Sequence, residues 1–147
     1  MHLIVYTSEY VITDEEIRDV LKDIRDISKI KNAKQNITGF LFYHSRRFIQ
    51  LIEGDKDRLE GLMNTLFHDT RHKNIKYLIN EPIKERSFSK WNMDTLNLDH
   101  ACEAAFEKNL IKLRDIYKGF FVVTTSDFLT FMKKFLNDPQ MIELINA

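Results

Sequence analysis

The fold is decided by residues 37–55, which read Ile-Thr-Gly-Phe-Leu-Phe-Tyr-His-Ser-Arg-Arg-Phe-Ile-Gln-Leu-Ile-Glu-Gly-Asp. Two apolar runs, residues 37–43 and 47–53, are joined here by the polar turn His44-Ser45-Arg46. Runs of this length are typical of buried strands, and so short a connection implies an antiparallel pair. The stretch therefore predicts a β-hairpin. Gly54-Asp55 ends it, and Asp55 is a good N-cap for a helix that follows.

Amphipathic helices are predicted on both sides of this hairpin. The first begins at the capping box formed by Thr13 and Glu16, and the second follows Asp55. Each carries an apolar stripe at helical spacing, which we expect to face a core. The stripes consist of Ile17, Val20, Leu21, Ile24 and Ile27 in the first helix and of Leu59, Leu62, Met63, Leu66 and Phe67 in the second.

Three further strands complete the predicted sheet. Residues 2–7, 75–80 and 92–98 are short apolar or β-branched runs, and Pro82 ends the second of them because proline cannot donate to a central ladder. The order is then β-α-β-β-α-β-β, the ferredoxin-like split pattern with one added strand. This is an α+β fold whose two helices cover one face of the sheet.

Residues 99–147 are predicted to form a C-terminal helical cap. One helix spans residues 100–118, with Gly119 as its C-terminal cap, and a second apolar stripe runs from Phe128 to Leu136 before Pro139. The sheet has a second face to cover, and these two helices are the expected cover. The chain is thus interpreted as a sheet domain over residues 1–98 followed by this cap.

Charge and composition exclude several classes of protein. The chain has 147 residues, with 22 Lys+Arg and 22 Asp+Glu, so it lacks the positive charge of a nucleic-acid or anionic-membrane binder. Cys102 is its only cysteine, which excludes an intrachain disulfide and a cysteine-based metal centre. No apolar run approaches the ~18 residues of a membrane span, and no signal peptide precedes the first strand. We therefore expect a cytoplasmic protein with neither nucleic acid nor membrane as a partner.

Two polar side chains fall on strands that are otherwise apolar. Gln50 lies in the middle of its strand with the same parity as Phe48 and Ile52, and Tyr6 has the parity of Ile4. A buried amide without partners costs about 1–3 kcal/mol, so both groups need hydrogen bonds. Either they satisfy each other or the backbone, or both point at a polar ligand between the sheet and the helices.

A third polar group lies at the far ends of the two helices. Asn32 follows the first helix, and Asp69, Arg71 and His72 follow the second. Asn32 as a helix C-cap and Arg71 as a solvated charge are the ordinary explanations. Together, however, an amide and a cationic fork suit a carbonyl-rich heterocycle and its phosphate. His68 and His72 are four apart, but no HExxH motif accompanies them, and no metal site is predicted.

Taken together and in this order, these residues resemble the BLUF family of blue-light receptors that use flavin, and in particular its short PixD-like members. The resemblance covers roughly residues 2–98. It is most specific at Tyr6, at Gln50 with the Leu-Ile-Glu-Gly that follows, and at the pair Trp91 and Met93. The other segments that carry it are 3–8, 32–33, 37–39, 69–72, 81–83 and 88–93.

The resemblance implies a flavin between the two helices, with FAD expected and FMN or riboflavin as the alternatives. It implies that Tyr6 donates an electron and a proton to the excited flavin, and that Gln50 bridges Tyr6 and the flavin. Altered contacts with Trp91 or Met93 would then carry the signal to the last strand. The remaining implied contacts are Asn32 at the carbonyl and imide edge of the ring, Arg71 with Asp69 and His72 near the pyrimidine end or the phosphate, Ile24 and Leu66 flanking the ring, and Ser28 nearby.

The function expected on this basis is a photoreceptor and not an enzyme, since its photochemistry is reversible and leaves no product. No output domain fits in residues 99–147, so signalling would pass through the C-terminal helices to a protein partner or within a homo-oligomer. One alternative is a small acylphosphatase-like hydrolase, which would need a phosphate-binding arginine after the first strand, where residues 7–10 offer an acid instead. Another is a colourless ferredoxin-like regulatory or interaction module.

Overall fold

The computed structural model describes residues 1–11, 13, 15–44, 46–90 and 92–97, together with residues 126 and 130. Its elements are β1 (His2–Tyr10), α1 (Ile17–Lys34), β2 (Thr38–His44), β3 (Arg47–Gly54), α2 (Lys56–Phe67), β4 (His72–Pro82) and β5 (Asn92–Asn97). This is the predicted order, and the ferredoxin-like α+β fold is confirmed. The C-terminal helical cap, its boundary at residue 98 and Trp91 lie outside the described residues. Within the described part of the chain, no helix is long and apolar enough to cross a membrane.

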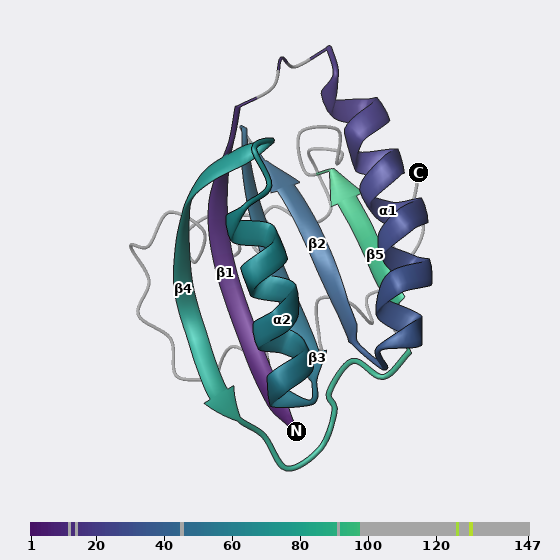
Figure 1. The fold of residues 1–147 in the computed structure, drawn as a ribbon, viewed down its shortest axis with the longest axis vertical. Coiled ribbons are helices and arrows are strands. Elements are labelled where there is room, and N and C mark those ends of the chain that lie inside the picture. Colours follow the sequence, from purple (N-terminus) through teal and green to yellow (C-terminus); the bar gives the residue numbers. More distant parts are fainter. Residues whose placement is uncertain are drawn as a thin grey trace.

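The five strands form one sheet in the order β4-β1-β3-β2-β5. The pairs β4–β1, β1–β3 and β3–β2 are antiparallel, and β5 pairs parallel with β2. Helices α1 and α2 lie on the same face of this sheet (Figure 1). The predicted hairpin is confirmed, with Thr38 opposite Glu53 and His44 opposite Arg47. Pro82 ends β4, which is an edge strand where a missing N–H costs least.

The two helix starts were not predicted equally well. Asp55 caps α2 as expected, since its carboxylate accepts from the backbone N–H groups of Asp57 at 3.1 Å and Arg58 at 3.4 Å. The prediction that α1 begins at Thr13 was wrong, because the helix starts at Ile17. Only half of the capping box forms, with the N–H of Thr13 donating to the Glu16 carboxylate at 3.3 Å. These residues make a turn that leads into α1.

The two apolar stripes face the sheet except at their margins. At 3.6 residues per turn, Ile27 lies about 80° around α1 from Ile17, and Phe67 lies about 80° around α2 from Leu59. Both side chains are exposed, at 51% and 54%, so their assignment to the core was wrong. The helix-side core itself includes Ile4, Leu41 and Ile52 from the strands and Ile17, Leu21, Leu59 and Met63 from the helices. The opposite face of the sheet is buried as well, through Leu3, Val5, Phe40, Phe42, Ile49 and Leu51.

An irregularity between β2 and β5 places Met93. Gly39 is opposite Asn92 and Phe40 is opposite Asp94, so Met93 is one residue in excess on β5. Its φ of 61° is a left-handed value that few residues other than glycine adopt. Gly39 is needed at this point because a Cβ would lie 2.1 Å from the carbonyl oxygen of Leu51 on β3. The bulge directs Met93 into the helix-side core, where its side chain is fully buried.

The segment that leads into β5 is held to the end of β3 by Glu53. The carboxylate of this fully buried residue accepts from the backbone N–H of Ser87 at 2.9 and 3.1 Å and from that of Phe88 at 2.9 Å. Arg86 donates to the Thr38 hydroxyl and to the Glu53 carbonyl oxygen, both at 2.9 Å. These bonds fix the start of β5 relative to the strand that carries Gln50.

Candidate functional site

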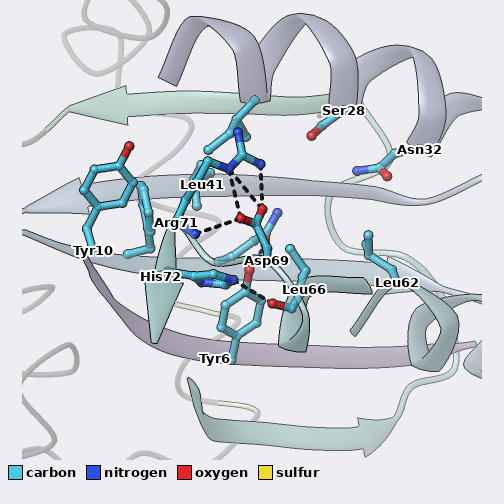
Figure 2. Close-up of a pocket in the computed structure, with 13 residues that line it drawn as sticks. Tyr6, Tyr10, Ser28, Asn32, Leu41, Leu62, Leu66, Asp69, Arg71 and His72 are labelled. Atoms are coloured by element: carbon cyan, nitrogen blue, oxygen red, sulfur yellow. Dashed lines mark hydrogen bonds and ion pairs between the residues drawn. The ribbon is translucent and has the colours of Figure 1, made fainter. Parts of the chain in front are cut away.

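A small pocket with a cavity volume of about 70 Å³ lies between the helix-side face of the sheet and the two helices (Figure 2). The structure brings all nine predicted cofactor-binding residues to its lining, namely Tyr6, Ile24, Ser28, Asn32, Gln50, Leu66, Asp69, Arg71 and His72. Four further residues line it, and these are Tyr10, Leu41, Phe48 and Leu62.

The two helices form opposite walls of the pocket because each presents residues four positions apart. Ile24, Ser28 and Asn32 follow one face of α1, and Leu62 and Leu66 follow one face of α2. Figure 2 shows Ser28 and Asn32 on one side of the pocket and Leu62 and Leu66 on the other. The walls are therefore mostly apolar, with one buried amide.

The interpretation of Asn32 as a helix C-cap was wrong. Helix α1 runs on to Lys34 and is capped by Gln35, so Asn32 lies in its last turn. The backbone carbonyl of Asn32 accepts from the N–H of Ile37 at 2.8 Å, which ties the end of α1 to the start of β2. The side chain is 5% exposed and lines the pocket, where it is held by regular helix geometry.

Tyr6 and Gln50 are directly opposite each other on β1 and β3. The Tyr6 hydroxyl donates to the Oε1 atom of Gln50, and both side chains are buried. Burial, assisted by the nearby groups of Asp69 and Tyr77, raises the pKa of Tyr6 far above its ordinary value of 10.0. The phenol therefore keeps its proton and acts as the donor. The pairing of the two side chains with each other, which was one of the two alternatives, is confirmed, and both also line the pocket.

The other end of the Gln50 amide reaches β5. Its Nε2 atom donates to the sulfur of Met93 at 2.8 Å, and both side chains are buried. Because Oε1 is used by Tyr6, the orientation of the amide is fixed by one partner at each end. Met93 is thus in direct contact with Gln50, whereas Trp91 lies outside the described residues.

Asp69 and Arg71, which both line the pocket, form a bidentate ion pair. The Nε atom of Arg71 lies 3.0 and 3.1 Å from the two carboxylate oxygens of Asp69, and Nη2 lies 2.6 Å from Oδ2. Hydrogen bonding to Arg71 lowers the pKa of Asp69 below its ordinary value, and the same bonds raise the pKa of Arg71. Asp69 therefore orients the guanidinium group, and it remains ionised at neutral pH.

His72 is held by hydrogen bonds at both ring nitrogens. Nε2 lies 2.8 Å from the carbonyl oxygen of Leu66, so this nitrogen carries a proton, and Nδ1 lies 2.9 Å from the buried hydroxyl of Ser8. His68 directs Nδ1 to the carbonyl oxygen of Asn64 at 2.7 Å instead. Among the described residues there is no group of three or more potential metal ligands.

Tyr10 is the lining residue that the sequence interpretation missed most clearly. Phe48 and Leu41 could have been found from strand parity, and Leu62 from its helical stripe. Tyr10 required the first strand to continue three residues beyond Thr7, which it does. Strand alternation then puts Tyr10 on the same face as Tyr6.

The pocket has the features that a flavin requires. Apolar side chains from two facing helices suit a flat aromatic ring, and Asn32 offers an amide to a carbonyl and imide edge. Arg71 adds a cation oriented by Asp69. The buried hydroxyl of Tyr10 has no hydrogen-bond partner among the described residues, so a ligand that brings an acceptor would satisfy it.

Comparisons with known proteins point to one family. The family model of BLUF, the sensors of blue-light using FAD, matches residues 1–94. The chain is 27% identical over 119 residues to the blue light- and temperature-regulated antirepressor BluF of Escherichia coli (strain K12). The matched region covers 78% of this chain and 29% of that protein. It is 30% identical over 82 residues to the photoactivated adenylate cyclase subunit alpha of Euglena gracilis, covering 56% of this chain and 8% of that one. The chain thus spans less than a third of either curated relative.

Solved structures of similar length match over almost their whole chains. The photo-activated state of BlsA superposes with a TM-score of 0.75 at 25% identity, covering 95% of this chain and 98% of that one. The dark state of the BLUF protein BlrB gives a TM-score of 0.71 at 25% identity, covering 90% and 95%. The family match over more than half of the chain, together with the pocket and its residues, leads to one conclusion: the chain belongs to the BLUF family and is a blue-light sensor that binds a flavin.

Proposed function

We propose that this chain is a reversible light switch without catalytic turnover, in which the side-chain amide of Gln50 is the part that rearranges. One observation carries the proposal. The amide lies between a phenol and a thioether, with its oxygen bonded to Tyr6 and its nitrogen bonded to Met93. These partners differ in chemistry, since a phenol can donate or accept whereas a thioether can only accept. Reorienting the amide therefore changes both contacts at once.

The residues supply the steps of the switch. Bound flavin supplies blue-light absorption and an excited state that accepts an electron. Tyr6 would give an electron and its phenolic proton to the bound flavin, and it would regain both from the flavin when the dark arrangement of charges is restored. While Tyr6 lacks its proton, the bond that holds the Oε1 atom of Gln50 is broken. The amide is then free to turn or to tautomerise before Tyr6 recovers its proton.

The dark arrangement is favoured by the bonding capacity of its partners. If the amide turns, Oε1 faces the sulfur of Met93, which has no proton to donate, and the bond at that end is lost. A neutral hydrogen bond contributes about 0.5–1.5 kcal/mol net, so this loss places the turned state within a few kcal/mol of the dark state. That gap suits a state that forms in light and returns thermally in the dark.

The other lining residues are proposed to bind the cofactor, with FAD as the native flavin. Asn32 bonds the carbonyl and imide edge of the ring, and Ile24 and Leu66 lie against its two faces. Arg71, oriented by Asp69, is the cationic contact. The two-bond geometry of this ion pair and the fixed tautomer of His72 support rigid positioning of that end of the site. Ser28, which lies between Ile24 and Asn32 on α1, is proposed to lie beside the ring.

Output is proposed to leave through β5. Met93 belongs to this edge strand and is hydrogen-bonded to Gln50. The bonds from the backbone of Ser87 and Phe88 to the Glu53 carboxylate fix the loop before β5. A change at Met93 is therefore transmitted along β5 and not absorbed by the loop. We propose that Trp91, on the same segment, and the C-terminal residues 99–147 receive the signal. They would pass it to a protein partner or within a homo-oligomer.

The test is a light-minus-dark absorbance spectrum of the purified full chain, followed by chromatography of the extracted flavin. We expect a yellow protein, a reversible red shift of the flavin band under blue light, and FAD in the extract. FMN or riboflavin in the extract would correct the flavin species and leave the switch intact. A protein that binds flavin but gives no red shift would contradict the proposed function.

A further inference from the structure

The hydroxyl of Tyr10 is a buried polar group in the pocket that the proposed switch does not use. Tyr10 is 4% exposed, lines the pocket, and has no hydrogen-bond partner for its hydroxyl among the described residues. Leaving such a group unpaired is unfavourable, so buried hydroxyls nearly always have a hydrogen-bond partner. The protein therefore holds a donor ready for a group that is not part of its own described structure.

The ring of Tyr10 is fixed in place and cannot easily turn its hydroxyl elsewhere. Its edge-to-face neighbours are Phe48, with ring centres 5.1 Å apart, and Tyr43, with ring centres 6.2 Å apart. The backbone is fixed too, because the N–H of Tyr10 donates to the carbonyl oxygen of Arg46 at 2.7 Å. The next residue, Val11, donates to the carbonyl oxygen of Arg71 at 3.0 Å. This geometry is that of a preorganised donor.

Tyr10 and Asn32 occupy opposite ends of the pocket. Figure 2 shows Asn32 at one end, Arg71 in between, and Tyr10 on the far side of Arg71. Arg71 is also close enough for its charge to act on the Tyr10 phenol. If Asn32 bonds the polar edge of the flavin ring, the opposite edge of that ring is a dimethylbenzene and has no acceptor. Near this end, the oxygen acceptors of a flavin are those of the side chain on N10.

We infer that the Tyr10 hydroxyl donates a hydrogen bond to an oxygen of the flavin's N10 side chain, either a ribityl hydroxyl or a phosphate. This inference rests on the proposed function, because it takes the flavin to lie with its imide edge at Asn32. Burial raises the pKa of Tyr10 to about 12, against a smaller opposing effect of Arg71, so the hydroxyl keeps its proton at neutral pH. Tyr10 is thus a second phenol in the site, and its role is binding, distinct from that of Tyr6.

Three flavins that share the same ring and differ only in the substituent on N10 test the contact between Tyr10 and the side chain. Lumiflavin has a methyl group on N10, riboflavin has the ribityl chain, and FMN adds a phosphate. The dissociation constant of each is measured by fluorescence titration of the flavin-free full chain, for the native protein and for Tyr10→Phe. Tyr43→Phe is the matched control, since it removes a hydroxyl from the neighbouring ring, which does not line the pocket.

We expect Tyr10→Phe to weaken riboflavin and FMN about tenfold and to leave lumiflavin unchanged, as the loss of one hydrogen bond predicts. Weakening of FMN alone also supports the inference and identifies the phosphate as the acceptor. Equal weakening of all three flavins would overturn it, because lumiflavin has no side-chain oxygen, and no weakening of any would overturn it as well. Thermal melting of the flavin-free Tyr10→Phe chain should show no loss of stability.

The titration also keeps the two proposals apart. If the native protein binds these flavins and shows the light-induced red shift while Tyr10→Phe behaves like native, only the role of Tyr10 is wrong. If the native protein shows no red shift, the proposed function fails whatever Tyr10 does.

Discussion

The amide nitrogen of Gln50 donates to the sulfur of Met93 at 2.8 Å, although β2 lies between the two strands that carry these residues. Neighbouring strands are about 4.8 Å apart, so the contact spans two strand spacings. It exists because both side chains are long and because the bulge opposite Gly39 turns Met93 into the helix-side core. The consequence is a direct link between the flavin pocket and an edge of the sheet.

Replacing Met93 with Leu should separate light detection from output. The variant keeps the apolar volume and removes the acceptor for the Gln50 nitrogen. We expect the red shift to persist, because Tyr6 and Gln50 remain. In the native protein, light should speed amide exchange in β5 by about two- to tenfold, the equivalent of one lost hydrogen bond, and the variant should lose this difference. Hydrogen-exchange mass spectrometry in dark and light measures it.

Met63→Leu is the control for that experiment, since Met63 is equally buried but lies on α2 and does not line the pocket. It should keep both the red shift and the light-dependent exchange. A Met93→Leu chain whose β5 exchange still responds fully to light would show that the signal leaves by another route.

Replacing Tyr6 with Phe should abolish the red shift while flavin stays bound. The change removes the electron and proton donor and retains the aromatic ring. Tyr77→Phe provides the control, because Tyr77 is opposite Tyr6 on β4 but is 39% exposed. Light-minus-dark spectra should be flat for the first variant and native for the second. A full photocycle in Tyr6→Phe would disprove the role assigned to this phenol.

Replacing Glu53 with Ala should destabilise the fold at the start of β5. Two backbone N–H groups, of Ser87 and Phe88, would lose their acceptor, and we expect a loss of about 2–4 kcal/mol in the free energy of unfolding. Chemical denaturation measures it. Glu60→Ala is the comparison, because Glu60 forms an exposed ion pair with Lys56 at 3.8 Å, and its loss should cost about 0.5 kcal/mol or less. Equal losses in the two variants would show that Glu53 is not a clamp.

Asp69 should make stability depend on acid pH. Hydrogen bonds from Arg71 lower the pKa of Asp69 in the folded state below its ordinary value of 3.8. The stabilisation is therefore complete above that ordinary value and is lost as the pH falls through the folded-state pKa. Because the pair is partly exposed, we expect a contribution of about 1 kcal/mol or less. The difference in unfolding free energy between native protein and Asp69→Asn should be constant at neutral pH and shrink in acid. A difference that grows in acid would contradict this assignment.

Much of the pocket was predictable because it follows from two simple periods. Alternation along a strand put Tyr6 and Gln50 on one face, and the hairpin and helix order brought their strands together. Ile24 and Ser28 were predicted from the resemblance to the BLUF family, and their four-residue spacing places them on the same face of α1 as Asn32. These positions depend on local geometry that the sequence pattern expresses directly.

Other features could not be predicted because they depend on contacts distant in sequence. The left-handed backbone conformation of Met93 arises where β5 pairs with β2, and no pattern in the sequence around Met93 predicts it. The extension of β1 to Tyr10 follows from its pairing with His72 on β4. Ile27 and Phe67 are exposed because the face through which each helix contacts the sheet is narrower than its apolar stripe. The stripe alone does not give the width of that face.

The central claim is that light rearranges the amide of Gln50, and the light-minus-dark absorbance spectrum of Gln50→Leu tests it most directly. Leucine keeps the volume of the side chain but can neither accept from Tyr6 nor donate to Met93. Gln35→Leu, at the exposed C-cap of α1, serves as the control and should show a native photocycle. The account predicts that Gln50→Leu binds flavin and gives no reversible red shift. A red shift of native size and recovery in Gln50→Leu would contradict it.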